Sequence, residues 1–153
     1  MQKSNGYKAL QFLFMALLAG QAAFLFIALY LVQQRVFVSN MQQLEKIMLP
    51  MLIVLSLVCM FSGNRIFKRK LQQLNDMPSL NAKFNEYRAA CLVRWALLEG
   101  CCLFAIICFM LTSEYLFILI AGLLLFIFGS QVPVKNKVAA DLGISPEELD
   151  SIS

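Results

Sequence analysis

The chain has 153 residues, of which 60% are hydrophobic and 14% are charged, and its formal net charge is +4. A typical soluble domain has about 45–50% apolar and about 25% charged residues, so this composition excludes an ordinary soluble globular protein. We expect one membrane domain from residue 1 to residue 134, followed by a short C-terminal tail from 135 to 153.

The first apolar segment follows a short basic N-terminal flank. No charged residue occurs from Ala9 to Gln34, a stretch long enough to cross ~30 Å of hydrocarbon at ~1.5 Å per residue. The flank and the segment resemble a signal peptide, but the apolar run continues past Gly20 to Val32, which is too long for a cleaved signal core. The sequence therefore predicts a retained membrane span at about residues 9–33.

Further apolar segments predict three more membrane-spanning helices. Their expected bounds are residues 47–67, 89–112 and 115–134. Helices rather than barrel strands are expected, because these runs exceed the ~9–11 residues of a barrel strand and do not alternate. Apolar residues recur at helical spacing after the second span, so its helix is expected to continue until Pro78. The predicted fold class is all-α: a polytopic bundle of four transmembrane helices.

Basic residues are concentrated on one side of the predicted spans. Eleven of the thirteen Lys and Arg residues lie in the N-terminal flank, around the connection between spans two and three, or after span four. The positive-inside rule then places both termini in the cytoplasm. The expected location is the inner membrane of the cell. Four of these residues are also suited to bind anionic lipid headgroups, although a role in setting the topology alone is the favoured interpretation: Arg65, Lys68, Arg69 and Lys70.

The tail contains a signature for the start of a short helix. Ser145 is suited to cap the helix, Pro146 to occupy its first position, and Glu147 and Glu148 to lie in its first turn. We expect one or two helical turns that dock on the protein's own cytoplasmic face or on a partner.

The residue types that carry chemistry give no catalytic or metal site. All five cysteines lie in apolar segments and the chain has no His, so a disulfide framework, a zinc site and an activated thiol are not expected. The cysteines are expected to pack as small hydrophobic side chains. No enzyme activity, cofactor, metal or nucleic-acid partner is predicted.

The two halves of the chain are similar at an offset of 80 residues. Residues 5–32 and 85–112 share ten identities, which predicts two parallel repeats of a two-helix hairpin. Each copy contains two small residues at four-residue spacing, and such surfaces let helix backbones approach closely. Spans one and three are therefore expected to pack through these residues: Ala16 and Gly20 in one copy, Ala96 and Gly100 in the other.

Glu99 lies near the middle of the third predicted span. By helical rise it is ~16 Å from Arg88 and ~21 Å from Ser113. A charge at the bilayer centre costs ~2.5–3.5 kcal/mol, so such a residue is usually functional or hydrogen-bonded. Its expected partners across the bundle are Gln21 and Ser56.

A candidate intramembrane polar site follows from this position. Arg94 lies ~140° around the helix from Glu99 and is expected to extend toward the cytoplasmic border rather than pair with it. Trp95 lies on the same face as Glu99. The candidate site consists of Glu99, Gln21, Ser56, Arg94 and Trp95.

Two functions remain open at this stage. The first is a structural or accessory membrane subunit, as a homo-oligomer or in a larger membrane complex, in which Glu99 fixes packing by a hydrogen bond. The second is a small oligomeric proton- or cation-coupled transporter that uses Glu99.

A resemblance covers most of the chain. Its pattern is Tyr87-Arg88, Arg94 and Glu99-Gly100, followed after the fourth span by Pro133 and Asp141-Leu142. This pattern resembles small uncharacterised four-helix membrane proteins of Bacteroidota-type bacteria. The resemblance implies a four-helix membrane fold and no particular activity.

Overall fold

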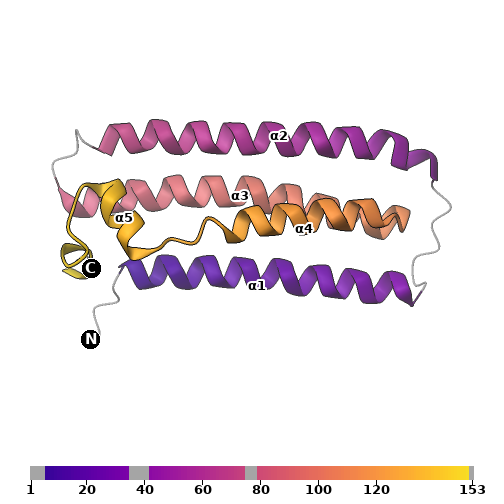
Figure 1. Ribbon diagram of the computed structural model, residues 1–153, viewed down its shortest axis with the longest axis horizontal. Coiled ribbons are helices and arrows are strands. Elements are labelled where there is room, and N and C mark those ends of the chain that lie inside the picture. The colour runs from indigo at the N-terminus through magenta and orange to yellow at the C-terminus, as the bar shows by residue number, and fades with distance from the viewer. Residues whose placement is uncertain (1–5, 35–41, 75–78, 152–153) are drawn as a thin grey trace.

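The computed structural model describes residues 6–34, 42–74 and 79–151 (Figure 1). Within these stretches the chain is helical and contains no strand. The predicted all-α class is therefore confirmed. The elements are α1 (Gly6–Gln33), α2 (Gln42–Gln73), α3 (Leu80–Thr112), α4 (Tyr115–Gly129), α5 (Lys135–Leu142) and a short 3₁₀ helix, η2 (Glu148–Ser151).

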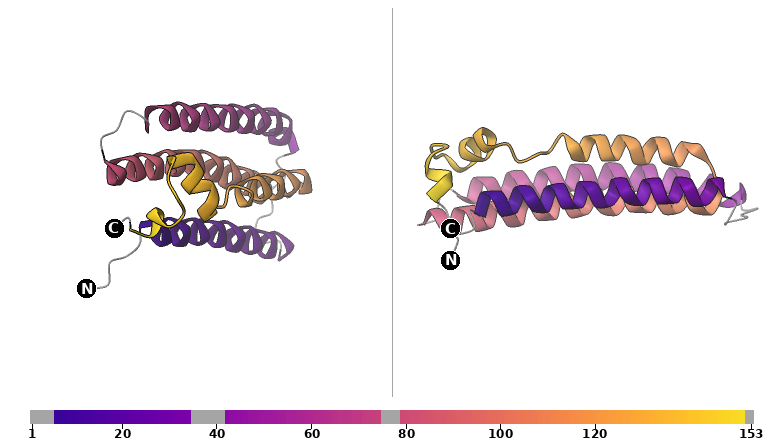
Figure 2. Two further views of the ribbon diagram at one scale, coloured as in Figure 1. Left: turned by 60° about the vertical axis from the view of Figure 1, so that its left-hand side comes forward. Right: turned by 90° about the horizontal axis from the view of Figure 1, so that it is seen from below.

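The helix α3 lies at the centre of the bundle. α2 packs on one side of it, and α1 and α4 pack on the other side and against each other (Figures 1 and 2). Successive long helices run in opposite directions, so α1 and α3 run in the same direction (Figure 1). The start of α1, the end of α2, the start of α3 and the whole of α5 lie at one end of the bundle, which we call the terminal end.

Three of the described helices are long and apolar enough to cross a membrane. They are α1, the part of α2 from Glu45 to Gln73, and α3, with 28, 29 and 33 residues. About 20 residues are needed to cross the hydrocarbon core. The helix α4 is apolar but has only 15 residues, so it rises only ~22 Å.

The helix α4 ends at Gly129, whereas the fourth span was predicted to reach residue 134. The Ser130 hydroxyl donates a hydrogen bond to the Ile127 carbonyl oxygen at 2.7 Å, and this bond closes the last turn. Pro133 has no backbone N–H and disfavours helical geometry in the residue before it, so the helix does not resume. Residues 130–134 therefore leave α4 without forming a helix, and α5 begins after them.

The helix α2 extends past the predicted end of the second span, as the spacing of apolar residues indicated. It continues to Gln73, and Leu74, which follows it, is 2% exposed. The predicted stop at Pro78 lies outside the described residues. Lys70, near the end of α2, forms an ion pair with Glu86 of α3, which ties the two helices together at the terminal end.

The predicted cap in the tail is present. The Ser145 N–H donates to the Glu148 carboxylate at 3.0 Å, and the Glu148 N–H donates to the Ser145 hydroxyl at 3.3 Å. These reciprocal bonds precede η2, whose Leu149 is completely buried. The tail therefore docks on its own chain, which was one of the two expected arrangements.

Three aromatic rings form the centre of the contact among α1, α3 and α4. Phe14 stacks on Phe128, with ring centroids 4.9 Å apart, and meets Trp95 edge-on at 5.0 Å. Phe14 is fully buried and Trp95 is 2% exposed. Trp95 is therefore part of the aromatic core, and it also lies beside Arg94, with which the sequence grouped it.

Candidate functional site

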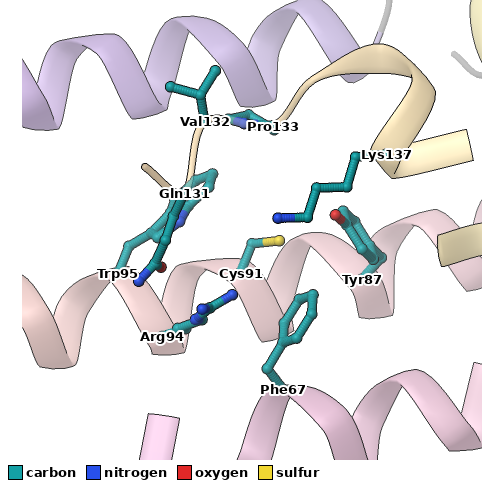
Figure 3. Close-up of a pocket in the computed structure, with 9 residues that line it drawn as sticks. All are labelled: Phe67, Tyr87, Cys91, Arg94, Trp95, Gln131, Val132, Pro133 and Lys137. Carbon is teal, nitrogen blue, oxygen red and sulfur yellow. The ribbon is translucent and has the colours of Figure 1, made fainter. Parts of the chain in front are cut away.

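A small polar cavity lies inside the terminal end of the bundle (Figure 3). Its volume is about 20 Å³, close to the space that one water molecule needs. Four parts of the chain meet there: α2, α3, the segment after α4, and α5. The residues that line it are Phe67, Tyr87, Cys91, Arg94, Trp95, Gln131, Val132, Pro133 and Lys137.

Residues 130–134 close one side of this cavity. Non-helical backbone at a membrane requires partners for its polar groups. Tyr7 donates a hydrogen bond from its hydroxyl to the Pro133 carbonyl oxygen at 3.0 Å, and the Gln11 amide donates to the same oxygen at 3.4 Å. Two side chains of α1 therefore hold this segment in place, and Gln131 faces the cavity.

Arg94 is held between α2 and α3 rather than extended from the bundle. Its guanidinium lies over the Phe67 ring, 5.2 Å from the centroid, in a cation–π contact. The same ring meets Tyr87 edge-on at 5.8 Å. Arg94 Nε is buried and has no hydrogen-bond partner among the described residues.

Two cations converge on this cavity. Arg94 of α3 and Lys137 of α5 approach the Cys91 thiol from different sides (Figure 3). Within the described parts of the chain, neither forms an ion pair. The carboxylate that acts on this cluster is Asp141, which accepts a hydrogen bond from the Tyr87 hydroxyl at 3.2 Å. With one negative and two positive charges, the cluster has a surplus of one positive charge.

Glu99 is separate from this cavity and from its expected partners. No residue that the structure describes forms a hydrogen bond or an ion pair with its carboxylate. Gln21 is 2% exposed, and both polar atoms of its amide are buried without a hydrogen-bond partner in the described structure. The Ser56 hydroxyl is also buried without such a partner. The expected hydrogen bonds from Gln21 and Ser56 to Glu99 are therefore absent.

Gln21 and Glu99 nevertheless lie at similar depths. The contact between Phe14 and Trp95 aligns α1 with α3, which runs in the same direction (Figure 1). Gln21 follows Phe14 by seven residues, and Glu99 follows Trp95 by four. At ~1.5 Å per residue, the two side chains differ by ~5 Å along the bundle.

Ser56 belongs to the interface between α2 and α3. Ser56 and Cys59 of α2 both adjoin the Cys101 thiol of α3. That thiol also points toward the Leu55 carbonyl oxygen, at 3.9 Å. The predicted intramembrane site is therefore divided among separate places in the bundle.

The four small residues lie on outward faces instead of between spans one and three. All four are exposed, and a Cβ atom added at Gly20 or Gly100 would meet nothing within 4 Å. The helices α1 and α3 do pack together, but the large rings of Phe14 and Trp95 fill their contact. The predicted packing role is wrong within one chain, because bulky side chains occupy the inner faces. The residues concerned are Ala16, Gly20, Ala96 and Gly100.

The cysteines are unpaired, and all but Cys59 are buried, as a packing role requires. In the described parts of the chain, no group of three or more His, Cys, Asp or Glu side chains is arranged to hold a metal ion.

Sequence reasoning missed the contribution of α5. Val138, Ala139 and Leu142 are buried and recur at helical spacing, so an amphipathic helix was detectable there. Lys137 lies on that helix and completes the cavity.

Comparison of the chain with protein-family models, curated proteins and solved structures gave no match.

Proposed function

We propose that this chain is a multi-pass integral membrane protein that serves as a structural or accessory subunit and associates with further copies of itself. The observation that carries this proposal is the environment of Glu99. Its carboxylate has no hydrogen bond or ion pair among the described residues, and it neighbours the outward-facing Ala96 and Gly100.

A second copy supplies what this face lacks. Small residues let two α3 helices approach closely, and close approach brings the two Glu99 side chains together. A protonated carboxyl group can then donate a hydrogen bond to its ionised counterpart. A twofold axis lets each copy use the same surface to supply the partner that the other needs. Twofold symmetry is also the commonest symmetry of soluble oligomers. The cost of a carboxylate in the bilayer is thereby reduced.

The proposed topology has four crossings, with both termini in the cytoplasm at the inner membrane of a bacterial cell. At ~3.3 Å per residue, residues 130–134 add ~16 Å to the ~22 Å length of α4. The combined length exceeds the ~30 Å thickness of the hydrocarbon core. Basic residues at the terminal end support this orientation. Arg65, Lys68 and Arg69 are exposed there and are proposed to meet anionic lipid headgroups, whereas Lys70 pairs with Glu86.

The proposed two-hairpin repeat is supported by one tyrosine in each of α1 and α3. Tyr7 and Tyr87 occupy equivalent positions in the repeat. The hydroxyl groups of both donate to the part of the chain that follows α4, to the Pro133 carbonyl oxygen and to Asp141. Equivalent tyrosines thus hold the same C-terminal segment.

Oligomeric state tests the proposed function. The protein is reconstituted in liposomes at a series of protein-to-lipid ratios, and single-molecule photobleaching counts the copies in each complex. Gly100→Leu is expected to weaken association about tenfold, since it separates the two helices and breaks the hydrogen bond between the two Glu99 side chains, and such interhelical hydrogen bonds contribute about 1–2 kcal/mol. Gly122→Leu on α4 is the matched control, because a Cβ atom added there also meets nothing within 4 Å. A monomeric wild type, or equal loss in both variants, contradicts the proposal.

Substitutions at Glu99 separate a packing role from a coupling role. Glu99→Gln keeps a hydrogen-bonding group and is expected to retain most of the association. Glu99→Leu removes it and is expected to weaken the complex while the chain remains folded, since Glu99 forms no hydrogen bond or ion pair with the described residues.

The second candidate function is a small oligomeric proton- or cation-coupled transporter that uses Glu99. The observation that favours it is Gln21, whose buried amide has no hydrogen-bond partner among the described residues and lies at a depth similar to that of Glu99. Proteoliposomes containing a pH-sensitive dye provide the test. A transporter shows a proton flux that Glu99→Gln abolishes without loss of folded protein. A wild-type flux equal to that of empty liposomes excludes proton coupling.

A further inference from the structure

We propose that the cavity at the terminal end binds a phosphate group through Arg94 and Lys137. The group is supplied by an anionic lipid headgroup or by free phosphate, and both offer the same oxygens. This site lies apart from the outward face of Glu99 and does not depend on the self-association proposed above.

The arrangement of charge indicates an anion. Arg94 and Lys137 come from different helices and converge on one small cavity (Figure 3). Like charges held together in a partly buried place repel each other unless an anion lies between them. Asp141 is the carboxylate of the cluster, and its hydrogen bond to Tyr87 leaves both cations without an ion pair in the described structure. The surplus of one positive charge matches the single negative charge of a phosphodiester.

The polar groups of the cavity suit phosphate oxygens. Arginine offers N–H donors in a planar fork that fits a phosphate, and lysine adds a mobile point charge. Arg94 Nε is buried in the cavity wall without a partner among the described residues, so a donor is available there. The Phe67 ring under the guanidinium fixes its plane.

The space available suggests how such a group enters. The cavity, at about 20 Å³, has room for about one small polar group and not for a metabolite. An open hollow of about 440 Å³ lies between the end of α2 and α5, lined by residues that include Lys68 and Asp141. Asp141 of the hollow accepts a hydrogen bond from Tyr87, which lines the cavity, so the hollow and the cavity are neighbours. One phosphate oxygen occupies the cavity, and the remainder of the phosphate or headgroup lies in the hollow.

Thermal unfolding of the purified protein in an uncharged detergent tests the site. Three additives are compared: phosphatidylglycerol, inorganic phosphate, and a diacylglycerol with the same acyl chains but no phosphate. The first or the second is expected to raise the unfolding temperature above that seen with diacylglycerol, because a ligand that binds only the folded state stabilises it. Stabilisation by the lipid alone identifies a headgroup as the source, and stabilisation by both identifies free phosphate as sufficient.

Two variants locate the effect. Lys137→Met is expected to weaken binding about tenfold or more, as loss of a charge-assisted hydrogen bond implies. Lys137 is exposed, so this substitution leaves the core intact. Arg94→Met, provided that the variant protein folds, is expected to weaken binding as strongly as Lys137→Met. Lys8→Met is the matched control, since Lys8 is an exposed cation at the same end of the bundle but does not line the cavity and is not among the proposed lipid contacts. The proposal is overturned if neither phosphate compound stabilises the wild type more than diacylglycerol, or if Lys8→Met and Lys137→Met weaken binding equally.

Discussion

Replacing Phe14 with Ala removes the ring that joins α1 to both α3 and α4. Phe14 is fully buried and takes part in two of the three ring pairs of the cluster that it forms with Trp95 and Phe128. Each such pair contributes about 0.5–1.5 kcal/mol beyond area burial, so the loss is about 1–3 kcal/mol. A buried Phe→Ala change in a water-soluble core costs about 3–5 kcal/mol. The range of about 1–3 kcal/mol applies here. Lipid tails are as apolar as the Phe side chain, so removing that side chain from water contributes little to the stability of a membrane protein.

The effect is measurable by unfolding the protein in bicelles with increasing SDS. Trp95 is the only tryptophan in the chain and belongs to the same cluster, so its fluorescence reports the opening of this contact. Circular dichroism provides a second readout of helix content. Phe12→Ala is the matched control, since Phe12 is on the same helix but is 78% exposed. The reasoning is refuted if the two variants lose the same free energy of unfolding, or if Phe14→Ala loses less than about 0.5 kcal/mol.

Three further predictions follow from individual contacts. Gly6→Ala places a Cβ atom 2.8 Å from the buried Phe84 ring of α3 and is expected to lower the free energy of unfolding by about 1–3 kcal/mol. In the control Gly122→Ala, the added Cβ atom meets nothing within 4 Å, so this change is expected to be neutral or stabilising. Mild oxidation with copper phenanthroline is expected to join Cys59 to Cys101 by a disulfide, which mass spectrometry of the digested protein detects. A disulfide between Cys59 and Cys102 is not expected, because Cys102 faces α4. Tyr87→Phe removes the hydrogen bond to the Asp141 carboxylate of α5, which contributes about 1.5–3 kcal/mol as a bond to a charged group. This change is expected to speed hydrogen exchange in α5 while exchange in α1 is unchanged.

The helical class and the three long apolar helices follow from sequence because they depend on local composition. The cap formed by Ser145 and Glu148 was also predictable, since both of its hydrogen bonds join residues three apart. The end of α4 was missed because its apolar pattern continues to Val134, while a cap at Ser130 and the effect of Pro133 end the helix earlier. Apolar composition alone does not distinguish helix from extended backbone.

The inward and outward faces of the helices were not predictable from hydrophobicity. In a membrane protein both faces are apolar, so the periodicity that orients a soluble helix is weak. The pair Ala96 and Gly100 therefore looked like a contact with α1, although Trp95 and Phe14 form that contact. The cavity around Arg94 was hidden for another reason: Lys137 is 43 residues away in the sequence, and only the docking of α5 brings it near.

The most direct test of the proposed function is cysteine cross-linking between copies in native membranes. The five native cysteines are replaced by Ala, and Ala96→Cys or Gly100→Cys is introduced singly on α3. Leu119→Cys, which is on α4 and is 66% exposed in the wild type, serves as the control. Self-association through the face of Glu99 predicts disulfide-linked dimers from the two α3 variants and few from the control. Dimer yields from Ala96→Cys and Gly100→Cys no higher than that from Leu119→Cys would contradict it.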